Sequence, residues 1–156
     1  MGSSIVDTIS SMIKHASVNK RESHKLINDA EKLSRKYKMP ERRLWYLKVK
    51  AFSDSGQWPQ LRSLADSRAK PPIGYKPFAL VAIQHDQSAA EITRYIEKVP
   101  GPEERYNLFC QGKIWKRAVD EAVKLKDIHR VANVRSICND ADVQRTCEQM
   151  MARLSS

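Results

Sequence analysis

Apolar side chains recur every three or four residues along most of the chain, the spacing that places them on one face of an α-helix. Leu44, Leu47 and Ala51 show the pattern clearly. No stretch alternates apolar and polar residues for long enough to predict a β-strand. The pattern predicts helices over residues 5–13, 19–37, 40–56, 59–65, 78–83, 89–99, 103–111, 113–125, 128–138 and 141–154.

Two segments rich in proline and glycine interrupt this helical pattern. The first, KPPIGYKP, covers residues 70–77, and the second is Pro100–Gly101–Pro102. Proline has no amide hydrogen and its ring blocks the helix interior, so neither segment can continue a helix. Because the first segment also contains Ile73 and Tyr75, we expect a packed elbow at residues 70–78 rather than a flexible linker.

Two stretches of the chain resemble each other and suggest a repeated helical hairpin. They are FSDSGQW, residues 52–58, and FCQGKIW, residues 109–115. In each, an apolar helix ends at a glycine, Gly56 or Gly112, which we expect to adopt the left-handed turn, and the tryptophan would fill the space between hairpins. Many helices joined by short loops then predict an all-α fold of the α-solenoid class, in which stacked hairpins bury their apolar faces against their neighbours. The length predicts a single domain over residues 1–156.

Positive charge is concentrated in the first half of the chain. The net charge is +10, and residues 1–70 hold 15 Lys and Arg against 7 Asp and Glu, whereas residues 71–156 hold 13 against 11. Such a surface attracts nucleic acid, anionic lipid or an acidic protein, and charge alone does not choose among them. The basic residues crowd between positions 20 and 50: Lys20, Arg21, Lys25, Lys32, Arg35, Lys36, Lys38, Arg42, Arg43, Lys48 and Lys50.

Catalytic and metal-binding motifs are missing from the sequence. There is no G-x-S-x-G, P-loop, H-E-x-x-H or glycine-rich phosphate turn. His129, Cys138 and Cys147 lie nine residues apart, which is not the close spacing of metal ligands. An odd count of three cysteines favours reduced thiols. We therefore expect no enzyme, no cofactor and no metal.

The segment around residue 45 is the best candidate for a docking surface. If Leu44 and its helical neighbours point inward, then Arg42, Arg43, Tyr46 and Lys50 point outward, with Trp45 at the boundary. Arginine beside an aromatic residue is the composition of an interface anchor. The alternatives are that Trp45 belongs to the core and the arginines are merely solvated, or that the basic surface binds RNA or anionic lipid. No recognition motif accompanies the basic residues to favour nucleic acid.

Three pieces of the sequence occur in a fixed order: PERRLWYLK at residues 40–48, Trp58, and PIGYKPF at residues 72–78. Together they resemble the C-terminal region of the vacuolar protein sorting protein 16 family. That family reads P-[DE]-[KR]-R-L-W-[WY]-L-K and later S-P-I-G-Y-x-P-F. Pro71 stands here in place of the serine and Tyr46 in place of the second tryptophan. The spermatogenesis-defective protein 39 family of adaptors shares the P-I-G element but lacks so clear an R-L-W-Y-L-K block, and it is the second choice.

The resemblance implies an α-solenoid from a longer, non-enzymatic subunit of the HOPS and CORVET tethering complexes. It implies recruitment of the SM-family subunit, vacuolar protein sorting protein 33, for SNARE-mediated fusion at endosomes, lysosomes or vacuoles, with Arg43 at the contact. The protein would be cytoplasmic, peripheral on late endosomal, lysosomal or vacuolar membranes, and bound to them only indirectly through the complex, with no nucleic acid. Partner-docking hairpins are expected at residues 1–69, the elbow at 70–78 and C-terminal hairpins at 79–156.

Overall fold

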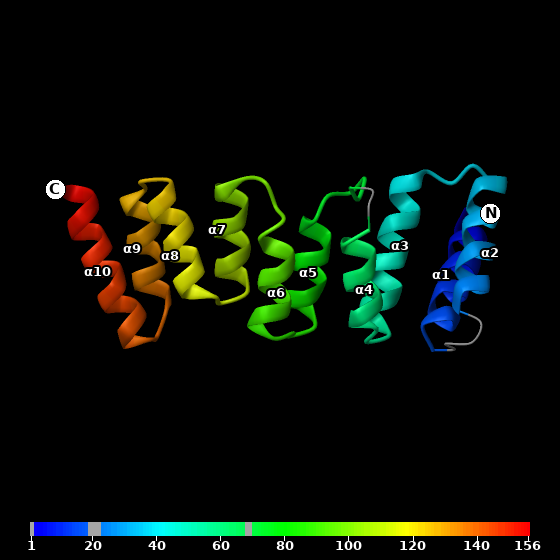
Figure 1. The fold of residues 1–156 in the computed structure, drawn as a ribbon, viewed down its shortest axis with the longest axis horizontal. Helices are drawn as coiled ribbons and strands as arrows, with labels where there is room; N and C mark the ends of the chain where they lie inside the picture. The colour runs from blue at the N-terminus through cyan, green and yellow to red at the C-terminus, as the bar shows by residue number, and fades with distance from the viewer. Residues whose placement is uncertain (1, 19–22, 68–69) are drawn as a thin grey trace. The chain divides into compact units, whose positions relative to one another are not determined.

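The computed structural model describes residues 2–18, 23–67 and 70–156, and within these ranges it contains ten α-helices and no β-strand (Figure 1). This confirms the all-α prediction. The beginning of the helix expected at 19–37 lies outside the described residues, and the helix there is described from Ser23. The helices are α1 Gly2–Val18, α2 Ser23–Lys36, α3 Glu41–Asp54, α4 Trp58–Ala65, α5 Lys76–Gln84, α6 Ala89–Ile96, α7 Pro102–Gln111, α8 Trp115–Lys124, α9 Ile128–Ile137 and α10 Ala141–Ser155.

The helices pack into two compact units, divided between His85 and Asp86. In the first unit α1 packs against α2 and α3, and α3 packs against α4 and α5. In the second unit each helix from α6 to α10 packs against the next one along the chain, and α8 also contacts α10. Each helix therefore buries its apolar face mainly against helices close to it in sequence, the packing of an α-solenoid built from stacked hairpins.

The proline-rich segment of residues 70–78 belongs to the first unit; it follows α4, and its last three residues, from Lys76 on, already form the start of α5. Gly74 has a φ of 72°, and its N–H donates to the carbonyl of Pro71 at 2.9 Å. Ile73 is buried, and the Tyr75 ring lies 6.3 Å from that of Phe78, which is fully buried at the start of α5. The apolar side chains of the proline-rich segment thus pack into the first unit.

One backbone turn recurs at four of the helix ends within the described ranges. At each, the residue in the left-handed conformation donates its N–H to the carbonyl three residues back, and the next residue donates to the carbonyl five residues back, which is the Schellman motif. The motif ends a helix and reverses the chain into the next one. The left-handed residues and their φ values are Lys38 at 54°, Gly56 at 69°, Lys113 at 58° and Lys126 at 53°.

The turn corrects one expectation from the sequence. Gly112 has a φ of −82° and is right-handed, so it does not make the left-handed turn; Lys113 does. The stretches match when Phe52 is aligned with Phe109, both buried, and Trp58 then coincides with Trp115. Gly56 therefore corresponds to Lys113, and the two glycines are one position out of register. Lysine adopts this conformation because two main-chain hydrogen bonds hold it there.

Candidate functional site

The exposed side of α3 carries three of the five residues expected to dock a partner. Arg43, Tyr46 and Lys50 follow one another at intervals of three and four residues, so they share one face of the helix. All three are exposed, and Tyr46 keeps 47% of its surface open to solvent. Leu44 and Phe52, on the other side of α3, are buried. We call Arg43, Tyr46 and Lys50 the α3 outer face.

The other two expected residues lie at the edges of this face. Arg42 is exposed; it is rotated by about 100° from Arg43, but it stands four residues before Tyr46 and so borders the α3 outer face on that side. Trp45 is half-buried and lines a groove of about 400 Å³ on the side of α3 that faces α2. The groove is lined by Glu31, Ser34 and Arg35 of α2, by Met39 of the turn, and by Glu41, Leu44, Trp45 and Lys48 of α3.

Lys48, one of the basic residues clustered between positions 20 and 50, is buried in the structure. It is 7% exposed, and its Nζ lies 2.6 Å from Oε1 of Glu31 and 5.9 Å from the centre of the Trp45 ring. The ion pair joins α2 to α3 across the groove. The sequence held the signal, because Lys48 falls four residues after Leu44 on the apolar face of the helix.

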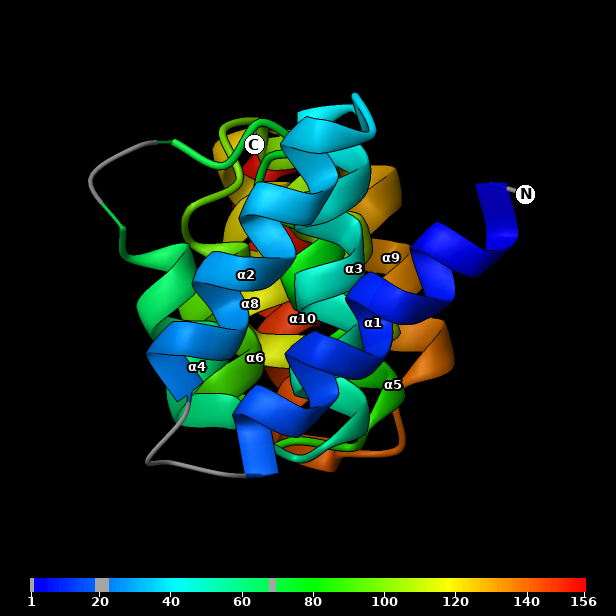
Figure 2. The ribbon, with the colours of Figure 1, turned by 90° about the vertical axis from the view of Figure 1, so that its right-hand side faces the viewer.

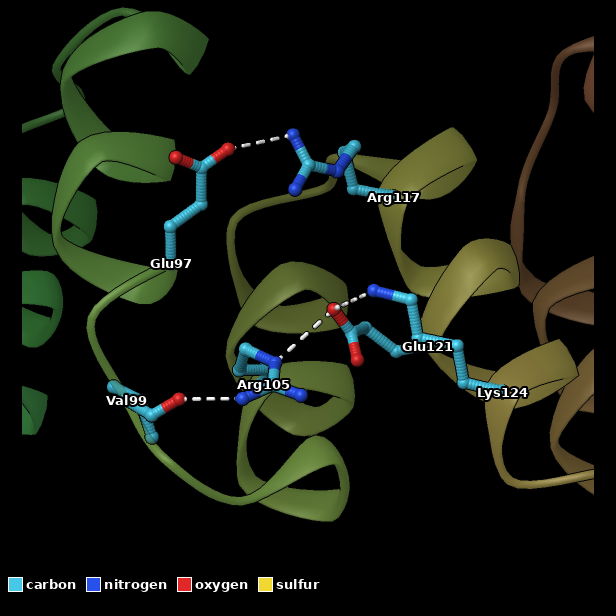
Figure 3. Close-up of polar contacts among 6 residues, drawn as sticks. All are labelled: Glu97, Val99, Arg105, Arg117, Glu121 and Lys124. Atoms are coloured by element: carbon cyan, nitrogen blue, oxygen red, sulfur yellow. Dashed lines mark hydrogen bonds and ion pairs between the residues drawn. The ribbon is translucent and has the colours of Figure 1, made fainter.

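A second buried ion pair holds α7 against α8 (Figure 3). Glu121 is 2% exposed, and its Oε1 lies 3.1 Å from Nε of Arg105 and 3.5 Å from Nζ of Lys124. Arg105 also donates from Nη1 to the carbonyl of Val99 at 2.6 Å, which ties in the loop after α6. The Arg105 guanidinium thus connects three consecutive segments of the second unit: the loop after α6, α7 and α8. No motif in the sequence predicted this ion pair.

The other perturbed groups of the second unit belong to its packing. Burial raises the pKa of the Tyr106 hydroxyl, which donates to the carbonyl of Arg130 at 3.0 Å and accepts from Nδ2 of Asn133 at 3.1 Å. Burial also raises the pKa of the Cys110 thiol. A raised thiol pKa opposes nucleophilic chemistry, because the thiolate is the reactive form.

Two kinds of feature, a metal site and a membrane-spanning helix, are absent from the part of the chain that the structure describes. No group of three or more His, Cys, Asp or Glu side chains there is placed to hold a metal ion. None of the helices in these ranges has the length and apolar character needed to cross a bilayer.

Comparison with known proteins identifies the family. Residues 2–154 match the family described as "Vps16, C-terminal region". The chain belongs to that family. The Vps16 family expected from residues 40–78 is thus confirmed, and the match extends over both compact units.

Curated relatives of the Vps16 family come from distant eukaryotes. The chain is 31% identical to the vacuolar protein sorting-associated protein 16 homolog of Drosophila melanogaster over 66% of its own length and 12% of that protein. It is 27% identical to the Dictyostelium discoideum homolog over 99% of its length and 17% of that protein. With the Saccharomyces cerevisiae protein 16 it shares 28% identity over 80% of its length and 16% of that protein. The chain spans less than a fifth of the length of each of these Vps16 proteins.

Proposed function

We propose that this chain is a non-enzymatic scaffold module of a tethering complex of the HOPS or CORVET type, and that its α3 outer face recruits an SM-family protein, vacuolar protein sorting protein 33. The observation that carries the proposal is the exposure of Arg43 beside Tyr46 on α3. Membership of the Vps16 family and the names of its curated relatives support a role in vacuolar protein sorting. The module would act on endosomal, lysosomal or vacuolar membranes as part of the complex, together with its other subunits.

The chemistry of the α3 outer face suits a folded protein partner. A guanidinium makes short, directional, charge-assisted hydrogen bonds to a carboxylate or a carbonyl oxygen. A tyrosine ring contributes a large contact area at little conformational cost, and its hydroxyl can hydrogen-bond when buried. Arginine and tyrosine are enriched among the few residues that dominate binding free energy at protein interfaces. Arg43 would bond to the partner while Tyr46 supplies the centre from which water is excluded.

The test exchanges the charge of Arg43. The Arg43→Glu chain is co-expressed with the SM-family subunit and analysed by affinity capture and size-exclusion chromatography. Because the substitution removes a favourable charge and adds a repulsive one, we expect the affinity to fall at least about thirtyfold, the size of a hot-spot loss. Lys116→Glu, an exposed site on α8 with the same change in charge, should bind normally.

Circular dichroism should show equal helix content in the two variants, because both positions are exposed on helices. Capture of the SM-family subunit by Arg43→Glu at the wild-type level would exclude the α3 outer face as the docking site. Loss of capture by both variants to the same extent would show that net charge, not this face, controls binding.

A further inference from the structure

The exposed side of α2 carries a row of lysines. Lys25, Lys32 and Lys36 are separated by seven and four residues, so they lie on one face and extend about 16 Å along the helix axis. All three are exposed, whereas Ala30 and Ser34, on the opposite side of α2, are buried. That buried side meets α1, which runs beside α2 in the foreground of Figure 2. We call Lys25, Lys32 and Lys36 the α2 lysine face.

Neighbouring groups add to the positive charge of this face. Arg35 and Lys38, in the last turn of α2 and just after it, are also exposed. Asp29 is half-buried between the first two lysines, and it is the acidic residue of the described part of α2 that shares their face. The other acid described on α2, Glu31, is already paired with the buried Lys48 at 2.6 Å. Five basic side chains against one acid leave a strongly positive surface.

The residue types of the two faces point to different partners. Lysine is depleted in protein–protein interfaces, where arginine and aromatic residues are enriched, so the α2 lysine face does not fit a protein as the α3 outer face does. Single-stranded nucleic acid is held by rows of exposed aromatic rings on which successive bases stack, whereas the described residues around these lysines offer the single exposed ring of Tyr37. Lysines clustered on one helix face do fit the headgroups of anionic lipids, which they attract as point charges without fixed geometry.

We propose that the α2 lysine face binds an anionic lipid surface directly. This goes beyond the docking of an SM-family protein, because it uses a different helix and a different ligand. Tyr37, next to Lys36, supports the proposal: it is 53% exposed, and Nζ of Lys36 lies 5.7 Å from the centre of its ring. Tyrosine side chains favour the headgroup region, where the ring meets an apolar layer and the hydroxyl stays in water.

The expected size of the effect follows from the charge. A basic residue close to an anionic leaflet strengthens binding by about fivefold. Replacing three lysines by glutamine should therefore weaken binding about a hundredfold. Because the attraction acts over about one Debye length, it should also weaken steeply as salt rises above physiological strength.

The experiment measures cosedimentation of the full chain with vesicles of phosphatidylcholine, with and without phosphatidylserine. We expect binding only to the vesicles that contain phosphatidylserine, and its loss in the variant Lys25→Gln/Lys32→Gln/Lys36→Gln. The matched control is Lys113→Gln/Lys116→Gln/Lys126→Gln, which removes the same charge from exposed sites of the second unit and should bind within a few-fold of wild type. Thermal unfolding by circular dichroism checks that both variants remain folded.

Three results would overturn the proposal. Wild-type chain that sediments equally with neutral and anionic vesicles, or with neither, would rule out an electrostatic lipid contact. Equal losses in the two triple variants would show that total charge is responsible and not the α2 lysine face. Binding of polyuridylate that the α2 substitutions abolish, in the absence of vesicle binding, would assign the face to RNA instead.

Discussion

The ion pair between Arg105 and Glu121 should be the most sensitive electrostatic contact of the second unit. In the variant Arg105→Met the long apolar stem is kept, but Glu121 loses its closest cation. Its Oε1 then retains only Lys124 at 3.5 Å, and its buried Oε2 has no hydrogen-bond partner within the described part of the chain. The carboxylate would be left 2% exposed with little compensation (Figure 3).

Removing one partner of a buried ion pair costs about 3–5 kcal/mol in free energy of unfolding. We expect a loss near the lower end, about 3 kcal/mol, because Lys124 remains beside Glu121 and water can enter where the guanidinium stood. About 1 kcal/mol of this loss comes from the missing hydrogen bond between Arg105 and the Val99 carbonyl. In the double variant Arg105→Met/Glu121→Leu no charge is left buried, so only this smaller part, about 1 kcal/mol, should persist.

Urea unfolding followed by circular dichroism measures the loss, and hydrogen exchange at the amides of α8 reports on the second unit separately. A loss of less than about 1 kcal/mol in Arg105→Met would contradict the burial of an uncompensated charge. A double variant as unstable as the single one would contradict it too, because the cost would then come from lost packing.

Two further predictions concern helix ends. Gly56→Ala should lower the free energy of unfolding by about 1 kcal/mol because φ is +69° there, although the added Cβ meets no atom within 4 Å. Lys113→Gly, at the equivalent position, should raise the melting temperature. Changes in melting temperature of the same sign in the two variants would refute the equivalence of the positions. The backbone N–H of Arg130 holds the pKa of the Asp127 carboxyl below its usual value, so its stabilising effect is present above the unfolded pKa of about 3.9 and is lost as pH falls through the folded pKa. The melting temperature of Asp127→Ala should therefore lie furthest below wild type at neutral pH and approach it near pH 3, and a constant difference across that range would contradict the cause.

The helices were predictable because their signals are local. Apolar spacing and breakers such as Pro100–Gly101–Pro102 lie close together in sequence, and each helix packs mainly on its sequence neighbours. The left-handed turn at Lys113 was missed because glycine is the usual signal, and here the hydrogen bonds of the turn impose the conformation on a lysine instead.

The candidate site was predictable in part. The helical spacing of Arg43, Tyr46 and Lys50 is enough to place them on one face. Whether a charged side chain at the border of the apolar stripe is solvated or buried depends on what approaches it from another helix. Lys48 is buried because Glu31, seventeen residues earlier, supplies its counter-charge, and helical periodicity carries no information about that pairing.

The four Schellman turns bear on how such a chain can change over time. Since main-chain bonds define each joint, residues other than glycine can occupy it at a modest cost, as lysine and glycine at equivalent places show. Mutations can then remodel the outward surface of one hairpin without redirecting the next. A family built on this joint could acquire new binding surfaces one hairpin at a time while its architecture stays the same.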